Sequence, residues 1–270
     1  MTEFSARTLR PPSAPVHGTL FVPAMAEPSA AVLLIGGSDG GEPSRMGEAL
    51  AGEGVAALSV AYFAQAGLPG KLRGIPLEYF FAALQALQDE LPSPDTPLAV
   101  LGISRGSEAA MLTAIHSPIR VCGVIAAVPG NVVLSGWPPG WPARRPAWLL
   151  DGRPLPYVNH FGPRCRDPDA VIPVELVPGP ILLVAAGADR VWPSAAMARA
   201  LSGRLRQHGD SHGHTILEYP EAGHRLGGLL PQPPPGLLPQ DTADEPPTRA
   251  ARADAWPKAI EFIRQLRTPQ

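Results

Sequence analysis

Short continuous runs of apolar residues alternate with longer stretches in which apolar and polar residues recur with a helical period. The apolar runs at residues 31–35, 55–62, 121–128 and 181–186 are typical of strands buried on both faces of a sheet. In residues 76–91 the apolar side chains recur at i, i+3 and i+4, which predicts an amphipathic helix. Strands that alternate with helices predict an α/β fold, with a mostly parallel central sheet and helices on both faces.

The remaining segments extend this alternation along the chain, with one long interruption. We expect an edge strand at residues 16–22, further strands at 97–103 and 215–219, and helices at 44–52, 107–112, 194–208 and 249–266. Between residues 129 and 180 the pattern breaks down in a segment rich in tryptophan and proline. Because so long a loop in a compact domain is usually functional, residues 130–180 are predicted to form a cap-like insertion. A proline-rich loop is expected at 229–248, within a single domain of residues 1–270.

Composition narrows the class of protein. Apolar residues form 45% of the chain and charged residues 17%, which is typical of a globular protein with a sizeable core. The net charge of −2 gives no support for binding to nucleic acid or to a membrane surface. No apolar run reaches the ~18–20 residues of a membrane span, and residues 1–15 do not resemble a signal peptide. We therefore expect a cytoplasmic protein, and its oligomeric state stays open.

The two cysteines point to no redox or metal chemistry. Cys122 lies inside an apolar run, so a buried free thiol is expected there, and Cys165 lies in the irregular segment. The sequence contains no metal-ligand spacing. No metal and no cofactor are therefore expected.

Ser104 stands between Gly102 and Gly106, where an apolar run ends and a helix-forming run begins. A strand, a sharp turn and a helix are the structural context of a G-x-S-x-G nucleophile elbow. Such a turn strains the backbone at the serine, and a Cβ on either flanking glycine would collide with the neighbouring strand or helix. Ser104 is therefore the predicted nucleophile, held above the carboxyl end of the sheet.

A serine nucleophile needs a base, and the base needs an orienting carboxylate. In hydrolases with a nucleophile elbow these residues follow one another along the chain as nucleophile, acid and histidine. Asp189 follows the predicted strand at 181–186, and His224 lies just beyond the strand at 215–219. Because both fall at the same edge of the sheet as Ser104, the predicted catalytic residues are Ser104, Asp189 and His224.

Competing residues lie either at the opposite end of the last strand or in the irregular segment. Those at the opposite end are His208, His212, His214 and Asp210, and those in the irregular segment are His160 and Asp151. His160 is an alternative base that could line the site, and Asp151 is an alternative acid. Asp189 could instead cap the helix that begins near Ser194.

The glycine-rich loop at residues 36–41 follows the first buried strand. In a hydrolase of this kind that loop supplies one N–H of the oxyanion hole, and the residue after the nucleophile supplies the other. The predicted donors are therefore Arg105 and either Gly37 or Ser38, with a plain turn as the alternative for the loop.

Three tryptophans lie in the irregular segment, namely Trp137, Trp141 and Trp148. They are candidates for the apolar walls of a substrate-binding pocket. The alternative is that they pack the insertion onto the rest of the domain.

With these residues identified, the chain resembles the catalytic domain of the acyl-CoA thioesterases and the bile acid-CoA:amino acid N-acyltransferases, a family with the α/β-hydrolase fold. The resemblance runs from about residue 31 to residue 266. It rests on short motifs in a fixed order, at residues 36–41, 54–63, 75–80, 101–106, 172–175, 189–192, 219–224 and 253–256.

The resemblance implies that a thioester of coenzyme A or of a carrier protein donates an acyl group to Ser104. Family members with a cysteine nucleophile tend to transfer the acyl group to an amino acid, whereas serine members mostly hydrolyse, so hydrolysis is expected. The sequence departs from the family in two respects. Animal members carry a β-sandwich domain before the catalytic one, whereas the first core strand expected here begins at residue 31. Ser107 stands where the family usually has glycine.

The leading hypothesis is a serine-type acyl-thioester hydrolase whose partner is a small-molecule acyl thioester. Alternatives are an acyltransferase that passes the acyl group to an amine or alcohol, a carboxylesterase or dienelactone-hydrolase-like enzyme, and a non-catalytic binding protein. Arg105, Arg144 and Arg145 are candidates for pairing with phosphates of the carrier.

Overall fold

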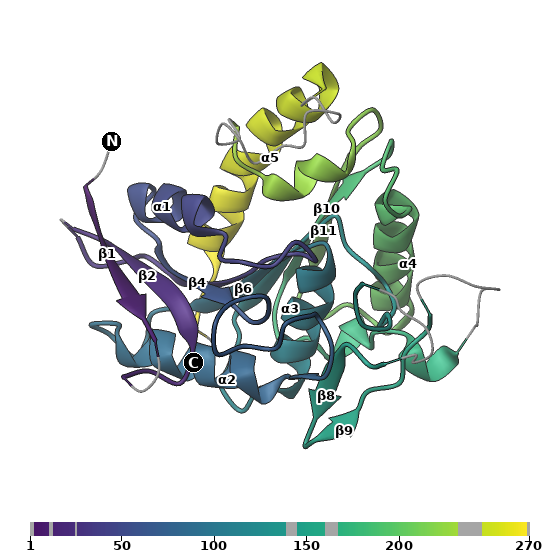
Figure 1. The fold of residues 1–270 in the computed structure, drawn as a ribbon. Helices are drawn as coiled ribbons and strands as arrows, with labels where there is room; N and C mark the ends of the chain where they lie inside the picture. Colours follow the sequence, from purple (N-terminus) through teal and green to yellow (C-terminus); the bar gives the residue numbers. More distant parts are fainter. Residues whose placement is uncertain are drawn as a thin grey trace.

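The computed structural model describes residues 3–10, 13–24, 26–138, 145–159, 167–231 and 245–268. An eight-stranded sheet forms the centre of the protein, and its twist is visible in Figure 1. The strand order is β1-β2-β4-β3-β6-β7-β10-β11, and all pairs from β4 to β11 are parallel. Only β1 and β2 run antiparallel to their neighbours. The strands are β1 (Phe4–Leu9), β2 (His17–Pro23), β3 (Ala31–Ile35), β4 (Ala56–Ala61), β6 (Leu98–Ile103), β7 (Gly123–Ala127), β10 (Ile181–Ala186) and β11 (His214–Tyr219). The mostly parallel sheet that the apolar pattern predicts is confirmed.

Helices cover both faces of the sheet, which also confirms the prediction. They are α1 (Ser44–Gly52), α2 (Glu78–Asp89), α3 (Arg105–His116), α4 (Ser194–Gln207) and α5 (Pro246–Gln265). Buried side chains of α1 and α5 share one apolar cluster, and those of α2, α3 and α4 share the other. The two layers separate clearly in Figure 1, where α1 and α5 lie on one side of the sheet and α2 and α3 on the other.

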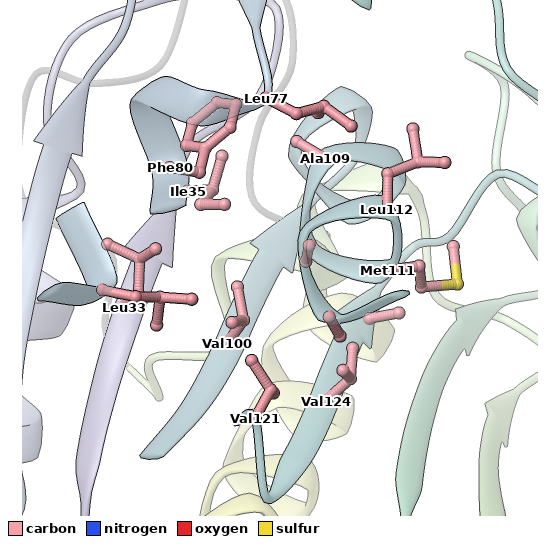
Figure 2. Close-up of a cluster of buried hydrophobic side chains, with 14 of the residues drawn as sticks. Leu33, Ile35, Leu77, Phe80, Val100, Ala109, Met111, Leu112, Val121 and Val124 are labelled. Carbon is pink, nitrogen blue, oxygen red and sulfur yellow. The ribbon is translucent and has the colours of Figure 1, made fainter. Parts of the chain in front are cut away.

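The core on the α2–α3 face shows why these runs form strands. Leu33, Val100 and Val124 come from three adjacent strands and point toward Met111 and Phe80 from the covering helices (Figure 2). Neighbouring residues on the same strands point to the opposite face and join the second cluster. Because both faces of these three strands are buried, each of them is apolar throughout, with no alternation of apolar and polar residues.

The N-terminal hairpin differs from the sequence-based expectation. The strand expected at an edge of the sheet is β2, which lies between β1 and β4, and β1 itself forms the edge. Five of the six residues of β1 are exposed, so it carries no apolar run that could reveal it. An edge strand open to solvent on both faces has little need for apolar side chains.

Outside residues 139–144 and 160–166, which are not among the described residues, the segment between residues 129 and 180 contains short regular elements. It contributes β8 (Trp148–Leu150) and β9 (Arg153–Pro154), which form a small sheet with β5 (Ile75–Pro76). Two short 3-10 helices, Pro168–Ala170 and Val174–Leu176, precede β10.

No helix among the described residues combines the length and the apolar character that a membrane crossing requires. The same residues contain no cluster of three or more His, Cys, Asp or Glu side chains that could hold a metal ion. Cys122 is free and buried, and Cys165 lies outside the described residues.

Candidate active site

Ser104 occupies a sharp turn between β6 and α3. Its backbone has φ 53° and ψ −119°, a conformation that L-residues rarely adopt. The Ser104 N–H donates to the carbonyl of Ala127 on the neighbouring strand at 2.9 Å, which ties the strained residue to the sheet. The side chain is nearly buried, with 7% of the residue exposed. Strain of this kind persists only where the surroundings determine it, and it is concentrated at functional sites.

The glycines on either side of the serine are required by close packing. An ideal Cβ at Gly102 would lie 2.1 Å from the carbonyl oxygen of Gly106 and 2.7 Å from Cβ of Ala110. One at Gly106 would lie 2.4 Å from the carbonyl oxygens of both Ile35 and Gly36. The elbow can therefore form only because β3, β6 and α3 approach one another without side chains between them.

The substitution Gly106→Ala tests this packing. We expect it to lower the free energy of unfolding by about 1–3 kcal/mol or more, because backbone atoms must move to admit the methyl group. Gly203→Ala in α4 is a matched control, since a Cβ there would meet nothing within 4 Å. Removing backbone freedom at Gly203 should stabilise the protein by about 0.5–1 kcal/mol. Urea unfolding measures the free energy of unfolding of both variants, and equal values for the two would contradict the packing argument.

The three residues of the predicted triad lie in hydrogen-bond contact. Nε2 of His224 is 3.0 Å from Oγ of Ser104, and Nδ1 of His224 is 2.8 Å from Oδ2 of Asp189. Asp189 follows β10, and His224 begins the 3-10 helix His224–Gly228 after β11. A carboxylate on Nδ1 requires the proton on that nitrogen, which leaves the Nε2 lone pair facing the serine hydroxyl.

Asp189 is held as a carboxylate by the loop that follows it. Its side chain is only 1% exposed. Burial by itself would raise its pKa, but hydrogen bonding and charge from His224, with further bonds from Ser194 and Trp192, hold the pKa of Asp189 below its usual value. Ser194 Oγ donates to Oδ2 at 2.7 Å, and the N–H groups of Val191 and Trp192 donate to Oδ1.

Asp189 therefore has part of the alternative role of a helix cap. Asp189 braces the turn into α4, but the cap position of that helix is Pro193. Sequence reasoning missed Ser194, which is fully buried and whose hydroxyl completes the bonding of the carboxylate. The indole of Trp192 contacts the edge of the His224 ring at 5.8 Å between centroids and donates from Nε1 to the carbonyl of Val128.

The loop that carries the predicted oxyanion donors Gly37 and Ser38 lies beside Ser104. An ideal Cβ on Gly37 would lie 3.4 Å from Cβ of Ser104, so the loop at residues 36–41 (the oxyanion loop from here on) passes directly beside the nucleophile. Among the described residues, the backbone N–H groups of Gly37 and Ser38 donate to no protein acceptor. Arg105 is the first residue of α3, so its N–H has no acceptor within the helix.

The side chain of Arg105 lies in the interior. Its guanidinium donates to the carbonyls of Leu134 and Ser135, both at 2.9 Å, and the side chain is 2% exposed. Nε of Arg105 lies 3.0 Å from Oε1 of Glu108, close enough for an ion pair although the two atoms are not aligned as a hydrogen bond. Because its donors are used within the protein, Arg105 is not free to bind carrier phosphates. Arg145 is exposed, and Arg144 lies outside the described residues.

Glu108 extends this buried network to the insertion. It is fully buried and accepts hydrogen bonds from the N–H of Leu134 and from Nε1 of Trp148. Burial raises the pKa of Glu108, whereas the charge of Arg105 acts to lower it. Ser107 adds another bond, because its hydroxyl donates to the Ser104 carbonyl and accepts from the N–H of Gly130. The first turn of α3 thus holds the start of the insertion.

The insertion residues proposed for substrate binding have different environments. Trp148 is fully buried and packs against Tyr62 and Phe80, so the structure places it in the core. Trp137 is partly buried and packs against the same core. Trp141 and His160 lie outside the described residues. Asp151 lies in the exposed turn between β8 and β9, where it does not contact the triad.

A second Ser–His–Asp arrangement lies at the opposite end of the sheet. Nε2 of His214 is 2.6 Å from Oγ of Ser202, and its Nδ1 is 2.5 Å from Oδ2 of Asp210. Ser202 is fully buried within α4 and accepts a hydrogen bond from Arg206. A substrate carbonyl has no access to such a hydroxyl, so this arrangement fastens α4 to β11. His208 and His212 lie near the same end.

Comparison with known proteins identifies several relatives in sequence. A family model described as "BAAT / Acyl-CoA thioester hydrolase C terminal" matches residues 158–234. Acyl-coenzyme A thioesterase 2 of Rattus norvegicus, a mitochondrial protein, is 31% identical over 78% of this chain and 48% of its own length. Acyl-coenzyme A thioesterase 1 of Homo sapiens is 30% identical over 78% and 52%. Acyl-coenzyme A amino acid N-acyltransferase 2 of Mus musculus is 28% identical over 78% and 52%. The chain thus spans about half the length of these relatives.

Solved structures agree on the fold. An acylaminoacyl peptidase of Pyrococcus horikoshii aligns with a TM-score of 0.65 and 13% identity, covering 100% of this chain and 43% of that one. MGS-M1, an α/β-hydrolase enzyme from a deep-sea metagenome, aligns with a TM-score of 0.59 and 15% identity, covering 98% and 99%. The comparisons confirm the resemblance to the acyl-CoA thioesterase and bile acid-CoA:amino acid N-acyltransferase family, and the fold that carries it is that of an α/β hydrolase.

Proposed function

We propose that this protein hydrolyses acyl thioesters through an acyl-enzyme on Ser104. The observation that carries the proposal is the continuous contact from Ser104 Oγ to His224 to Asp189, at 3.0 and 2.8 Å, on an elbow with φ 53°. Geometry of this kind suits acyl transfer in general. The choice of a thioester is supported by the relatives, of which two are named acyl-coenzyme A thioesterases.

The first half of the proposed reaction forms the acyl-enzyme. His224 Nε2 accepts the proton of Ser104 as Oγ bonds to the thioester carbonyl carbon, and the carbonyl oxygen becomes an oxyanion. The N–H groups of Arg105 and of Gly37 or Ser38 stabilise that oxyanion, at about 3–4 kcal/mol per donor. The carbon–sulfur bond then breaks, and the thiolate takes the proton from His224.

Water completes the cycle in the second half. His224 Nε2 accepts a proton from water as its oxygen attacks the acyl carbon, and a second oxyanion forms in the same place. When this intermediate collapses, the bond to Oγ breaks, Ser104 recovers its proton from His224, and the carboxylic acid leaves. Asp189 keeps the imidazole in the required tautomer and stabilises the imidazolium in both halves.

The same site would serve two neighbouring reactions. An amine or alcohol in place of water would make the protein an acyltransferase, and one relative is named an amino acid N-acyltransferase. An oxygen ester in place of the thioester would make it a carboxylesterase. Serine as nucleophile is the feature of this chain that favours water and hydrolysis, following the family trend.

Paired substrates test the proposal. We expect kcat/KM for an acyl-CoA to exceed that for the oxygen ester of the same acyl chain by at least about tenfold, which corresponds to ~1.4 kcal/mol of transition-state stabilisation. Each value is first divided by the rate of hydroxide-catalysed hydrolysis of that substrate. Equal or reversed preference would overturn the thioester assignment and favour the carboxylesterase. Mass spectrometry of products formed with added glycine separates the free acid from an N-acyl product.

A further inference from the structure

The hydroxyl of Tyr62 contacts the backbone of the oxyanion loop. Tyr62 follows β4, and its hydroxyl is 2.8 Å from the carbonyl oxygen of Gly36 and 3.2 Å from that of Gly37. The residue is 2% exposed. Its ring is fixed by the rings of Phe63, Phe80 and Trp148, with centroids 5.0, 5.3 and 5.8 Å away.

The geometry of the peptide bond connects this contact to the reaction. In a trans peptide the C=O of one residue and the N–H of the next point in opposite directions. Because Tyr62 holds the Gly36 and Gly37 carbonyls, the N–H groups of Gly37 and Ser38 point away from it. Neither of these two N–H groups donates to a protein acceptor among the described residues, and the loop passes beside Ser104.

We propose that Tyr62 is a positioning residue of the oxyanion hole, which fixes the direction of the Gly37 and Ser38 N–H groups by holding the carbonyls behind them. This inference rests on the proposed acyl-transfer site and adds a residue to it. Tyr62 touches neither substrate nor nucleophile, so its effect is on transition-state stabilisation through the loop. Preorganised donors stabilise an oxyanion best because they need no reorientation during the reaction.

The chemical state of Tyr62 suits this role. Burial raises the pKa of its phenol well above the ordinary value, so the hydroxyl keeps its proton and remains a donor. It has one hydrogen to share between the two carbonyls, and the shorter contact is to Gly36. A loop with this many glycines has little stiffness of its own, so an external donor has a clear effect on its shape.

Tyr79 provides a matched control for a purely structural role. Its hydroxyl also bonds to backbone groups, donating to the Ala61 carbonyl at 2.5 Å and accepting from the His17 N–H at 2.9 Å. Those contacts fasten α2 to β2 and β4 and do not involve the oxyanion loop. Tyr62→Phe and Tyr79→Phe each remove one oxygen and leave the ring, so their effects on stability should be similar.

The test compares kcat, KM and inhibitor binding in the two variants. We expect Tyr62→Phe to lower kcat by about 10- to 100-fold with KM changed less than threefold, since only oxyanion stabilisation weakens. Its affinity for a trifluoromethyl ketone, which forms a tetrahedral adduct with the serine, should fall by a similar factor. Affinity for a thioether that cannot react should stay constant. Tyr79→Phe should leave all four quantities within threefold of the parent protein.

Three outcomes would overturn the inference. They are an unchanged kcat in Tyr62→Phe, an equal fall of kcat in both variants, and an equal loss of affinity for the ketone and the thioether. The measurements are repeated with an oxygen ester, so that the role of Tyr62 is tested independently of the thioester assignment. A protein that hydrolyses only the ester, yet shows the Tyr62→Phe effect, would refute the proposed substrate and support the role of Tyr62.

Discussion

Replacing Ser104 with alanine is expected to lower kcat for acyl-thioester hydrolysis by roughly 10⁵- to 10⁶-fold. The substitution removes the nucleophile, so no acyl-enzyme can form and only the oxyanion hole and substrate binding remain. The fold should be retained, because alanine meets the same backbone strain as serine at φ 53° and loses only one hydrogen bond, to His224. Steady-state hydrolysis of an acyl-CoA measures the loss, and thermal unfolding checks the fold.

Ser202→Ala is the matched control for this experiment. Ser202 contacts a histidine that in turn contacts an aspartate, at distances as short as those around Ser104. It lies buried at the opposite end of the sheet, so its loss should leave kcat within twofold. A fluorophosphonate should label the parent protein and the Ser202→Ala variant, but not Ser104→Ala. Hydrolysis that survives in Ser104→Ala, or labelling that persists there, would refute the assignment of the nucleophile.

Replacing Arg105 with methionine is expected to have the largest effect on stability. The variant leaves the Glu108 carboxylate in the interior without its cation and frees the carbonyls of Leu134 and Ser135. Removing one member of a buried ion pair typically costs about 3–5 kcal/mol, because the remaining charge is uncompensated. Urea unfolding at neutral pH should therefore show a decrease of that size in the free energy of unfolding.

Arg45→Met supplies the comparison, because Arg45 pairs with Glu48 at the same i, i+3 spacing on α1. That pair is solvent-exposed, with 64% and 38% of the side chains accessible, so its loss should cost less than about 1 kcal/mol. The double variant Arg105→Met/Glu108→Leu should regain part of the stability, since no buried charge remains. If Arg105→Met lowered the free energy of unfolding no more than Arg45→Met does, the Arg105–Glu108 pair would stabilise the protein no more than an ordinary surface ion pair.

The residues of the predicted triad could be located from the sequence because their signals are local. Ser104 lies between two glycines at the boundary of a strand and a helix, Asp189 lies shortly after the apolar run at 181–186, and His224 lies just beyond the predicted strand at 215–219. Parallel strands place all such positions at one edge of the sheet, so recognising the strands is enough to bring the three residues together. The inner strands, such as β6 and β10, were recognisable because both of their faces are buried, whereas β11 is only partly buried.

The supporting residues could not be found in this way, because their roles depend on contacts distant in sequence. Tyr62 closes an apolar run and has the appearance of a core aromatic residue until its hydroxyl is seen beside Gly36. Ser194 begins a helix, as many serines do, and nothing in the sequence shows that it faces Asp189. Arg105 has the appearance of a surface cation, because burial of an arginine depends on partners that only the fold supplies.

The same limit applies to the insertion. Trp148 belongs to an irregular segment, where an aromatic side chain can either line a pocket or pack into the core. Its burial beside Phe80, with its indole N–H on Glu108, is decided by β5 and β8, which pair only across a long separation in the chain. A two-residue strand such as β5 has no period that a sequence pattern could reveal.

The second Ser–His–Asp arrangement has a consequence for annotation by geometric template. Among the described residues, a search that compares only interatomic distances would return the Ser202 arrangement, at 2.6 and 2.5 Å, together with the Ser104 triad, at 3.0 and 2.8 Å. Three features that such a template does not record distinguish Ser104 from Ser202. The backbone of Ser104 has a positive φ, the neighbouring strands approach it at glycines, and N–H groups without an acceptor lie beside it. A template that required free N–H donors for an oxyanion beside the serine, in addition to the triad distances, would accept Ser104 and reject Ser202.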